Sequence, residues 1–340
     1  MYRAEAEASV RQRLNSLADV DAEADGRLAA ILDDVARDTA VRWLGDRDLM
    51  LGGDRTDFRS FTRQLSERWG SALDRLEFMV AATEAIGADF VDTQAPTEHD
   101  SLFHVLVTLH ARACQIGHEV HWVLSGGYPR AAEARSRTLH EIVVAMQVLA
   151  DHGRNDGGAL VERYLDHAII SEARYLESLV THHAALGVEP PPDEVVQRVR
   201  ERRQELMTRH GPVFKQSFGW AAAVASDGTI VGAERVAGLG HLRPVYGLHS
   251  DSVHAGAHAA RSQIVDRGDG RFRHTNATMF GLGLAGVMTA RLLVHAAGSV
   301  VGSATVAPDV GFVVCAAALR TIATAVEVEF VSAGDALQGH

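Results

Sequence analysis

Apolar residues recur along most of the chain at intervals of three and four, which is the spacing of one face of a helix. The clearest case is the segment from Tyr128 to His152, where Pro129 suits a first helical turn and Gly153 ends the pattern. From Ile142 to Ala150 only Gln147 is polar. A helix that is apolar on nearly every side is covered on nearly every side. We therefore predict that this segment is the central helix of the fold.

The same spacing predicts helices elsewhere, and clusters of glycine and aspartate, such as residues 45–54 and 266–273, predict loops. The further helices are expected at about residues 27–44, 58–91, 102–124, 159–186, 193–210, 276–297 and 309–331. No alternation of apolar and polar residues is long enough to predict a sheet. The fold class is therefore expected to be all-α, a bundle of about nine to eleven helices with no significant sheet.

The loop around residue 50 also marks an expected boundary. We expect an N-terminal helical extension over residues 1–55, a central helical domain over 56–300, and a C-terminal helix and tail over 301–340. The composition, 46% hydrophobic and 23% charged, is that of an ordinary globular protein with a substantial core.

Charge and cysteine content narrow the function classes. The net charge of −11 disfavours broad binding to nucleic acid or to anionic membranes, because both require concentrated positive charge. Cys114 and Cys315 lie far apart in apolar helical patterns, which is typical of a reducing compartment. Residues 277–307 are apolar, but Arg291 and His295 interrupt them, so a buried helix is favoured over a membrane span. We expect a cytoplasmic protein without a membrane partner.

One charged group lies in the polar half of the predicted central helix. Glu133, Arg137 and Glu141 are spaced four apart, so they share a helix face. A carboxylate can then flank the guanidinium on each side. Arg137 and Glu141 are accordingly the first candidates for a polar site.

A second polar stripe follows a proline that can begin a helix, Pro244. Tyr246, Ser250, His254 and His258 are also spaced four apart. Such a stripe is either a site of hydroxyls and imidazoles or a buried network of hydrogen bonds that fixes helix packing. Because His and Ser in helices commonly find hydrogen-bond partners without catalysing anything, the buried network is the favoured interpretation.

The two polar groups, together with a loop glycine before the central helix, carry a resemblance. The chain resembles, over roughly residues 60–295, a largely bacterial, uncharacterised family catalogued as domain of unknown function 5677. The resemblance implies a helical domain and supplies no established reaction. If the polar signature of the family is a site, the ligand-binding residues here are Arg137, Glu141, Tyr246, Ser250 and His254.

The function that we favour is a binding or interaction module for an unknown small molecule or protein. Arg137 would engage an anionic or carbonyl group, and the hydroxyls and His254 would orient it. No cofactor and no metal is expected. The first alternative is a structural protein that forms homo-oligomers through its Ala/Gly/Val-rich C-terminal helices.

The second alternative is a metal-independent ribonuclease of the higher eukaryote and prokaryote nucleotide-binding type, recognised by Arg, four to six residues, then His. Six pairs satisfy that spacing in the chain, where chance predicts about five. Arg243 with His249, beside His254, is the pair of interest: the arginine would hold a phosphate of RNA while an imidazole transfers a proton.

A metal site was the remaining alternative. His110, Cys114, His118 and His121 can share one side of a helix. Free cysteine is commonly buried as a small apolar group, so we favour core and cap positions for these residues.

Overall fold

The computed structural model describes residues 2–15, 24–93, 100–253, 261, 264–266, 271–273, 277–303 and 310–338. The chain divides into two compact units, Met1–Gln64 and Leu65–His340. Helix α3 (Arg47–Thr93) contributes residues to both units. Each unit is described by itself below, and the domain limits expected at residues 55 and 300 stay predictions.

The first unit holds the helices α1 (Tyr2–Asn15) and α2 (Ala24–Gly45), which pack against each other. Arg13 of α1 pairs with Asp34 and Asp38 of α2. The loop expected over residues 45–54 was wrong, because α3 is helical from Arg47 onward and includes Gly52 and Gly53. A glycine in a helix costs only about 1 kcal/mol, which the helix formers around it can offset.

The second unit is built almost entirely of helices, which confirms the all-α class. After α3 its elements are α4 (Ser101–Ser125), α5 (Pro129–His152), η1 (Asn155–Gly158), α6 (Ala159–Asp166), α7 (Ala168–Leu186), α8 (Asp193–His210), η2 (Pro212–Lys215), η3 (Gly219–Ala221), α9 (Ala222–Ala225), α10 (Ile230–Val236), η4 (Gly240–Leu242), α11 (Arg243–Val253), β1 (Ile264–Asp266), β2 (Arg271–Arg273), α13 (Leu282–Gly302) and α14 (Val310–Gln338). The two short strands form an antiparallel hairpin, with Val265 opposite Phe272.

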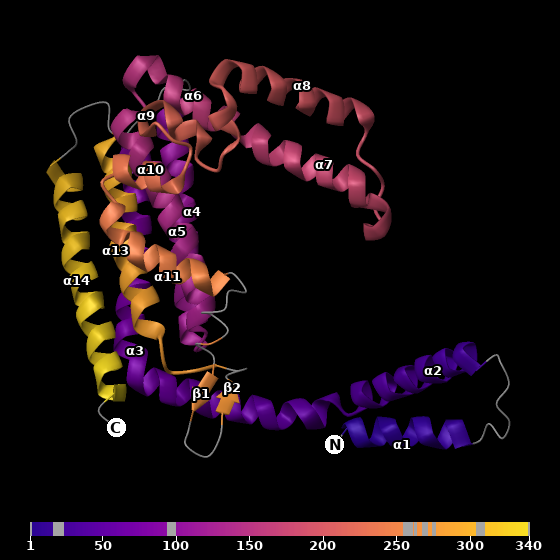
Figure 1. Ribbon diagram of the computed structural model, residues 1–340. Coiled ribbons are helices and arrows are strands. Elements are labelled where there is room, and N and C mark those ends of the chain that lie inside the picture. The colour runs from indigo at the N-terminus through magenta and orange to yellow at the C-terminus, as the bar shows by residue number, and fades with distance from the viewer. Residues whose placement is uncertain are drawn as a thin grey trace. The chain divides into compact units, whose positions relative to one another are not determined.

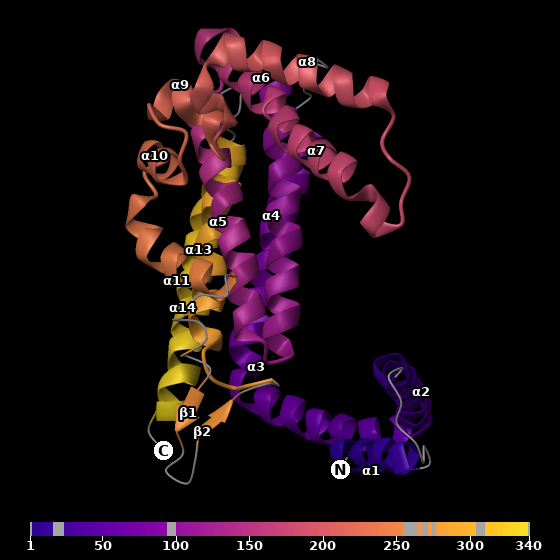
Figure 2. The same ribbon diagram turned by 45° about the vertical axis from the view of Figure 1, so that its right-hand side comes forward.

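The core of this unit lies between α4, α5 and α13, and α14 packs along α13 (Figures 1 and 2). Leu106, Leu139, Met146 and Leu293 are completely buried there. Full burial of such a side chain contributes about 1.5–3 kcal/mol. Because α5 contacts α4, α13 and α11, the predicted central helix is confirmed as central.

Glycine permits a close helix contact between α13 and α14. The ring of Phe330 on α14 lies against Gly286 of α13, where an added Cβ would come within 2.4 Å of a ring carbon. The same ring packs on Trp69 of α3, with ring centroids 5.9 Å apart. Gly286 therefore allows α14 to pack closely on α13.

Several boundaries differ from the expected ones, and the described residues contain somewhat more helices than the nine to eleven predicted. The helix expected over residues 159–186 is two helices, α6 and α7, which meet at His167. The His167 ring lies 2.8 Å from the backbone oxygen of Gln216, a contact that periodicity cannot reveal. The last two helices begin at Leu282 and Val310.

By length and composition alone, α13 and α14 are each apolar enough to cross a membrane. In the most apolar window of α13, 67% of the residues are buried, as is usual for a core helix, whereas 17% are buried in that of α14. This test does not distinguish core helices from membrane spans. The cytoplasmic location stays a prediction.

Candidate functional site

The polar half of α5 is covered by α11, which packs along it (Figures 1 and 2). Helix α11 begins at Arg243, one residue before Pro244, whose fixed φ suits a first helical turn. Arg243, Tyr246 and His249 are spaced three apart, so all three lie on one side of α11. Tyr246 and His249 are buried, at 7% and 2% exposure. The site is thus formed by two helix faces that are more than ninety residues apart in sequence.

Tyr246 joins the charged pair of α5. Arg137 Nη2 donates to the Tyr246 hydroxyl at 2.9 Å, and this hydroxyl donates to Glu141 Oε1 at 2.7 Å. Arg137 Nη2 and Glu141 Oε1 are also 3.0 Å apart. The expected meeting of Arg137 and Glu141 with Tyr246 is therefore present.

The second expected carboxylate has another partner. Glu133 pairs with Arg130, one turn earlier on α5, at 2.8 Å. The symmetric arrangement of two carboxylates around Arg137 was thus wrong, because Tyr246 comes in from α11 and occupies a position beside the guanidinium.

A second group of polar and charged residues, contributed by α5, α10 and α11, lies next to Tyr246. His140 Nε2 is 2.8 Å from Glu234 Oε1 of α10, and both residues are almost fully buried, at 2% and 1% exposure. Arg243 Nη1 lies 3.3 Å from each oxygen of the same carboxylate. Because Glu234 carries a buried charge, the ion pair with Arg243 and the hydrogen bond from His140 are what make its burial tolerable.

The ring of Tyr246 connects the two groups. The guanidinium carbons of Arg137 and Arg243 lie 5.1 Å and 4.9 Å from its centroid, and the His140 ring lies 5.0 Å away. We call Arg137, His140, Glu141, Glu234, Arg243 and Tyr246 the polar cluster. It contains two arginines and two carboxylates, so its formal charges balance when His140 is neutral.

Burial determines the protonation of Tyr246 and His140 in the polar cluster. Burial, with a smaller effect from Glu141, raises the pKa of Tyr246 to about 12, so the phenol keeps its proton. Burial also lowers the pKa of His140, against the opposing effect of Glu234. The neutral imidazole therefore holds its proton on Nε2 and donates it to Glu234. A raised pKa makes the Tyr246 phenol a weak acid and a lowered pKa makes His140 a weak base, so neither group is matched to proton transfer at neutral pH.

The other predicted residues of α11 have different surroundings. Ser250 is half-buried, and no hydrogen bond joins it to Arg137, Glu141 or Tyr246 within the described part of the chain. His254 lies outside the described residues, as does His258. The predicted contacts of His254 therefore stay a prediction.

In the pair proposed for RNA cleavage the histidine is hidden from solvent: His249 is 2% exposed, whereas 40% of the Arg243 side chain is exposed. Arg243 is engaged by Glu234, and burial lowers the pKa of His249. The Nε2 atom of His249 is buried and has no hydrogen-bond partner. The described residues thus give no support to a ribonuclease site at this pair.

The candidate metal ligands of α4 are engaged separately. Cys114 Sγ lies 3.8 Å from His110 Nδ1, His118 pairs with Glu84, and Ser125 Oγ lies 3.4 Å from His121 Nε2. Within the described part of the chain, no three His, Cys, Asp or Glu side chains are grouped so that they could hold a metal ion.

Two members of the polar cluster were not predicted as site residues. His140 directly precedes Glu141 at the edge of the apolar half of α5, and that position could have indicated a buried imidazole. Glu234 lies in a short helix whose sequence gives no signal of burial. Its partners come from α5 and α11, so only the tertiary structure could identify it.

Comparison with known proteins agrees with the resemblance seen in the sequence. Residues 103–272, half of the chain, match the family of unknown function DUF5677. The chain belongs to this family. The DUF5677 match begins in α4 and ends in β2, and it contains every residue of the polar cluster. No curated protein and no solved structure matches the chain.

Proposed function

We propose that this DUF5677 protein is a binding module whose ligand contacts Arg137, Glu141 and Tyr246, with Ser250 and His254 as the further expected ligand-binding residues. The observation that carries the proposal is that the Arg137 side chain is held in place and still accessible. Its guanidinium is held by Glu141 and by the Tyr246 hydroxyl, yet 24% of its side chain stays exposed. An arginine fixed in orientation at an accessible position loses little entropy when a ligand binds.

The chemistry of the cluster favours a small polar ligand with a carboxylate or carbonyl group. Such a group accepts hydrogen bonds from a guanidinium, and Glu141, with 32% of its side chain exposed, can accept a bond from a donor on the same ligand. Binding is favoured over acid–base catalysis because the raised pKa makes the Tyr246 phenol a weak acid, and because His140, a weak base with a lowered pKa, is buried and hydrogen-bonded to Glu234.

The proposal is tested by comparing wild-type protein with Arg137→Lys, which keeps the charge and loses the planar fork of donors. Both proteins are screened by thermal unfolding against a panel of small carboxylic acids, amides and ketones at fixed concentration. Arg112→Lys is the control, because Arg112 lies on α4 with 42% of its side chain exposed.

We expect at least one compound to raise the melting temperature of the wild type and of Arg112→Lys, with a much smaller increase in Arg137→Lys. A panel with no stabilising compound, or one that stabilises all three proteins equally, would contradict a ligand site at Arg137.

Homo-oligomerisation through the C-terminal helices also stays a prediction. It is motivated by α14, on which Val310, Val314 and Val328 are more than half exposed, at 75%, 60% and 58%. Light scattering over a wide concentration range tests it, and a constant monomer mass would remove it.

A further inference from the structure

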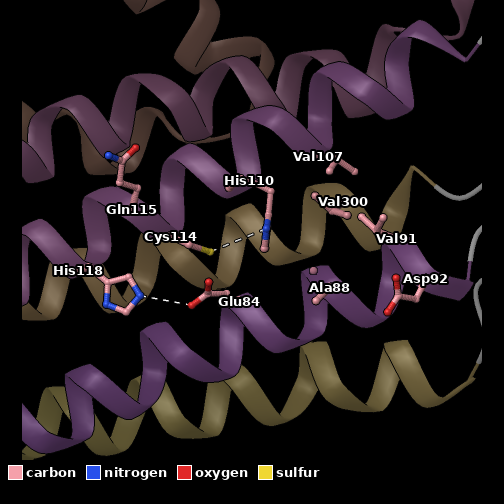
Figure 3. Close-up of a pocket in the computed structure, with 12 residues that line it drawn as sticks. Glu84, Ala88, Val91, Asp92, Val107, His110, Cys114, Gln115, His118 and Val300 are labelled. Atoms are coloured by element: carbon pink, nitrogen blue, oxygen red, sulfur yellow. Dashed lines mark hydrogen bonds and ion pairs between the residues drawn. The ribbon is translucent and has the colours of Figure 1, made fainter.

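A cavity of about 560 Å³ opens between α3 and α4, on helices that the polar cluster does not use (Figure 3). Val91 and Ala88 line it from α3, Val107 and Ala111 from α4, and Val300 from α13. The volume falls within the range of about 300–1,000 Å³ that is usual for small-molecule sites.

His110 gives the cavity a polar group in its buried part. Its side chain points from α4 toward α3, and only 5% of the residue is exposed (Figure 3). The ring lies where a Cβ on Gly87 would come within 2.3 Å of Cε1, so the glycine makes room for the imidazole. His110 Nδ1 contacts Cys114 Sγ at 3.8 Å, whereas Nε2 is buried without a hydrogen-bond partner. A buried polar atom without a partner lowers the stability of the protein, and a hydrogen bond from a ligand would recover that loss.

The polar groups in the buried part of the cavity are uncharged at neutral pH. Burial lowers the pKa of His110 to about 4, and it raises the pKa of the Cys114 thiol to about 12. A neutral thiol is a poor metal ligand and a poor nucleophile. These surroundings therefore suit a neutral molecule better than a metal ion or a reactive electrophile.

The charges at the opening of the cavity disfavour anionic ligands. Glu84 and Asp92 are exposed at the rim, and Glu84 pairs with His118 at 3.3 Å. Among the described residues that line the cavity there is no arginine or lysine. An anionic ligand would meet carboxylates without a permanent cation to compensate them.

We propose that this cavity binds a small, uncharged, predominantly apolar molecule, with one polar group of the ligand facing His110. The apolar walls supply the affinity, and the unpartnered Nε2 sets the orientation of the ligand. The rim carboxylates select against carboxylates, phosphates and sulfonates.

Two dyes that differ in charge test the proposal on the full chain. N-phenyl-1-naphthylamine is neutral, and 1-anilinonaphthalene-8-sulfonate adds a sulfonate to the same ring system; both fluoresce on entering an apolar site. The blocking variant is Ala88→Phe, which places a ring in the cavity from an exposed position. The matched control is Ala85→Phe, an exposed alanine of the same helix that does not line the cavity.

We expect the neutral dye to bind wild type and Ala85→Phe equally, and Ala88→Phe at least tenfold more weakly. The sulfonated dye should bind the wild type at least tenfold more weakly than the neutral dye. No fluorescence increase, equal binding to the two phenylalanine variants, or equal affinity for the two dyes would overturn the proposal.

The position of the ligand is tested by NMR, through the imidazole ¹⁵N resonances of His110. These resonances are assigned as the ones that are absent from the spectrum of His110→Phe. These resonances should shift when the neutral dye binds. If the dye binds and the His110 resonances do not move, the ligand does not lie against His110 and the proposed orientation is wrong.

Discussion

Replacing Tyr246 with phenylalanine isolates what a single hydroxyl contributes to the polar cluster. The substitution removes the oxygen that accepts from Arg137 and donates to Glu141. The ring remains, and so do its contacts with the His140 ring and the Arg243 guanidinium. The change is therefore confined to two hydrogen bonds.

The magnitude follows from the exposure of the two partners. A hydrogen bond to a charged group contributes about 1.5–3 kcal/mol to stability when it is well buried. Here 24% of the Arg137 side chain and 32% of the Glu141 side chain are exposed, so water can replace part of what is lost. Arg137 and Glu141 also keep their direct contact at 3.0 Å. We expect Tyr246→Phe to lower the free energy of unfolding by about 1–2 kcal/mol.

The assay is equilibrium unfolding in urea, followed by the fluorescence of Trp69 and Trp220, which are buried. The free energy of unfolding must depend on urea concentration with the same slope in both proteins, because only then does a shift of the unfolding midpoint measure a change in stability. Tyr175→Phe is the control, because Tyr175 is 65% exposed, and it should change stability by less than about 0.5 kcal/mol.

A double-mutant cycle with Glu141→Gln then assigns the effect to the hydrogen bond. Residues in direct contact should show a coupling energy of about 0.5–1.5 kcal/mol. If Tyr246→Phe is as stable as the wild type, or if the two substitutions are additive, the hydroxyl does not join α11 to Glu141 in the way described.

Three further substitutions or conditions have defined outcomes. Glu234→Ala should destabilise the protein by about 1–3 kcal/mol in the same urea assay, because the buried His140 loses its hydrogen-bond acceptor while Arg243, with 40% of its side chain exposed, can turn to water; an unchanged stability would contradict the buried contact of His140 with Glu234. Gly286→Ala should lower the free energy of unfolding by about 1–3 kcal/mol, because the added Cβ would lie 2.4 Å from the Phe330 ring. Gly298→Ala in the same helix is the control: its Cβ would meet nothing within 4 Å, so it should be neutral or stabilising. Burial lowers the pKa of His110 from its ordinary 6.5 to about 4, so between these two pH values the unfolded chain binds more protons than the folded protein. The free energy of unfolding should therefore fall by up to about 1.4 kcal/mol per pH unit as the pH drops from 6.5 to 4. His110→Phe should flatten that dependence, and an unchanged pH profile would show that His110 is not buried neutral.

Local patterns predicted the helices around the site well. Asp100 caps α4 by accepting from the Phe103 amide at 3.0 Å, and α5 runs from Pro129 to His152 as its proline and glycine signals indicate. The pairing of Arg137 with Glu141 was also predictable, because residues four apart on a helix are neighbours wherever the helix lies.

Errors arose where the structure departs from the local preference of the sequence. The break between α6 and α7 occurs at His167, which contacts the backbone of Gln216, so the continuous apolar pattern gave no warning. The glycines at residues 52 and 53 predicted a loop, yet the backbone is helical there. Propensity gives only a small energetic preference, and one or two kcal/mol elsewhere can reverse it.

The sequence by itself determined the fold class, the positions of α4, α5 and α8, and the charged face of α5 on which Arg137 pairs with Glu141, because periodicity, capping and side-chain spacing are properties of neighbouring residues. Only the tertiary structure decided that Tyr246 meets Arg137 and that Glu234 is buried beside His140. The physical reason is that the partner of a helix face is selected by the burial of apolar surface over the whole unit. A buried charge such as Glu234 is tolerated only where that packing also brings it its counterions.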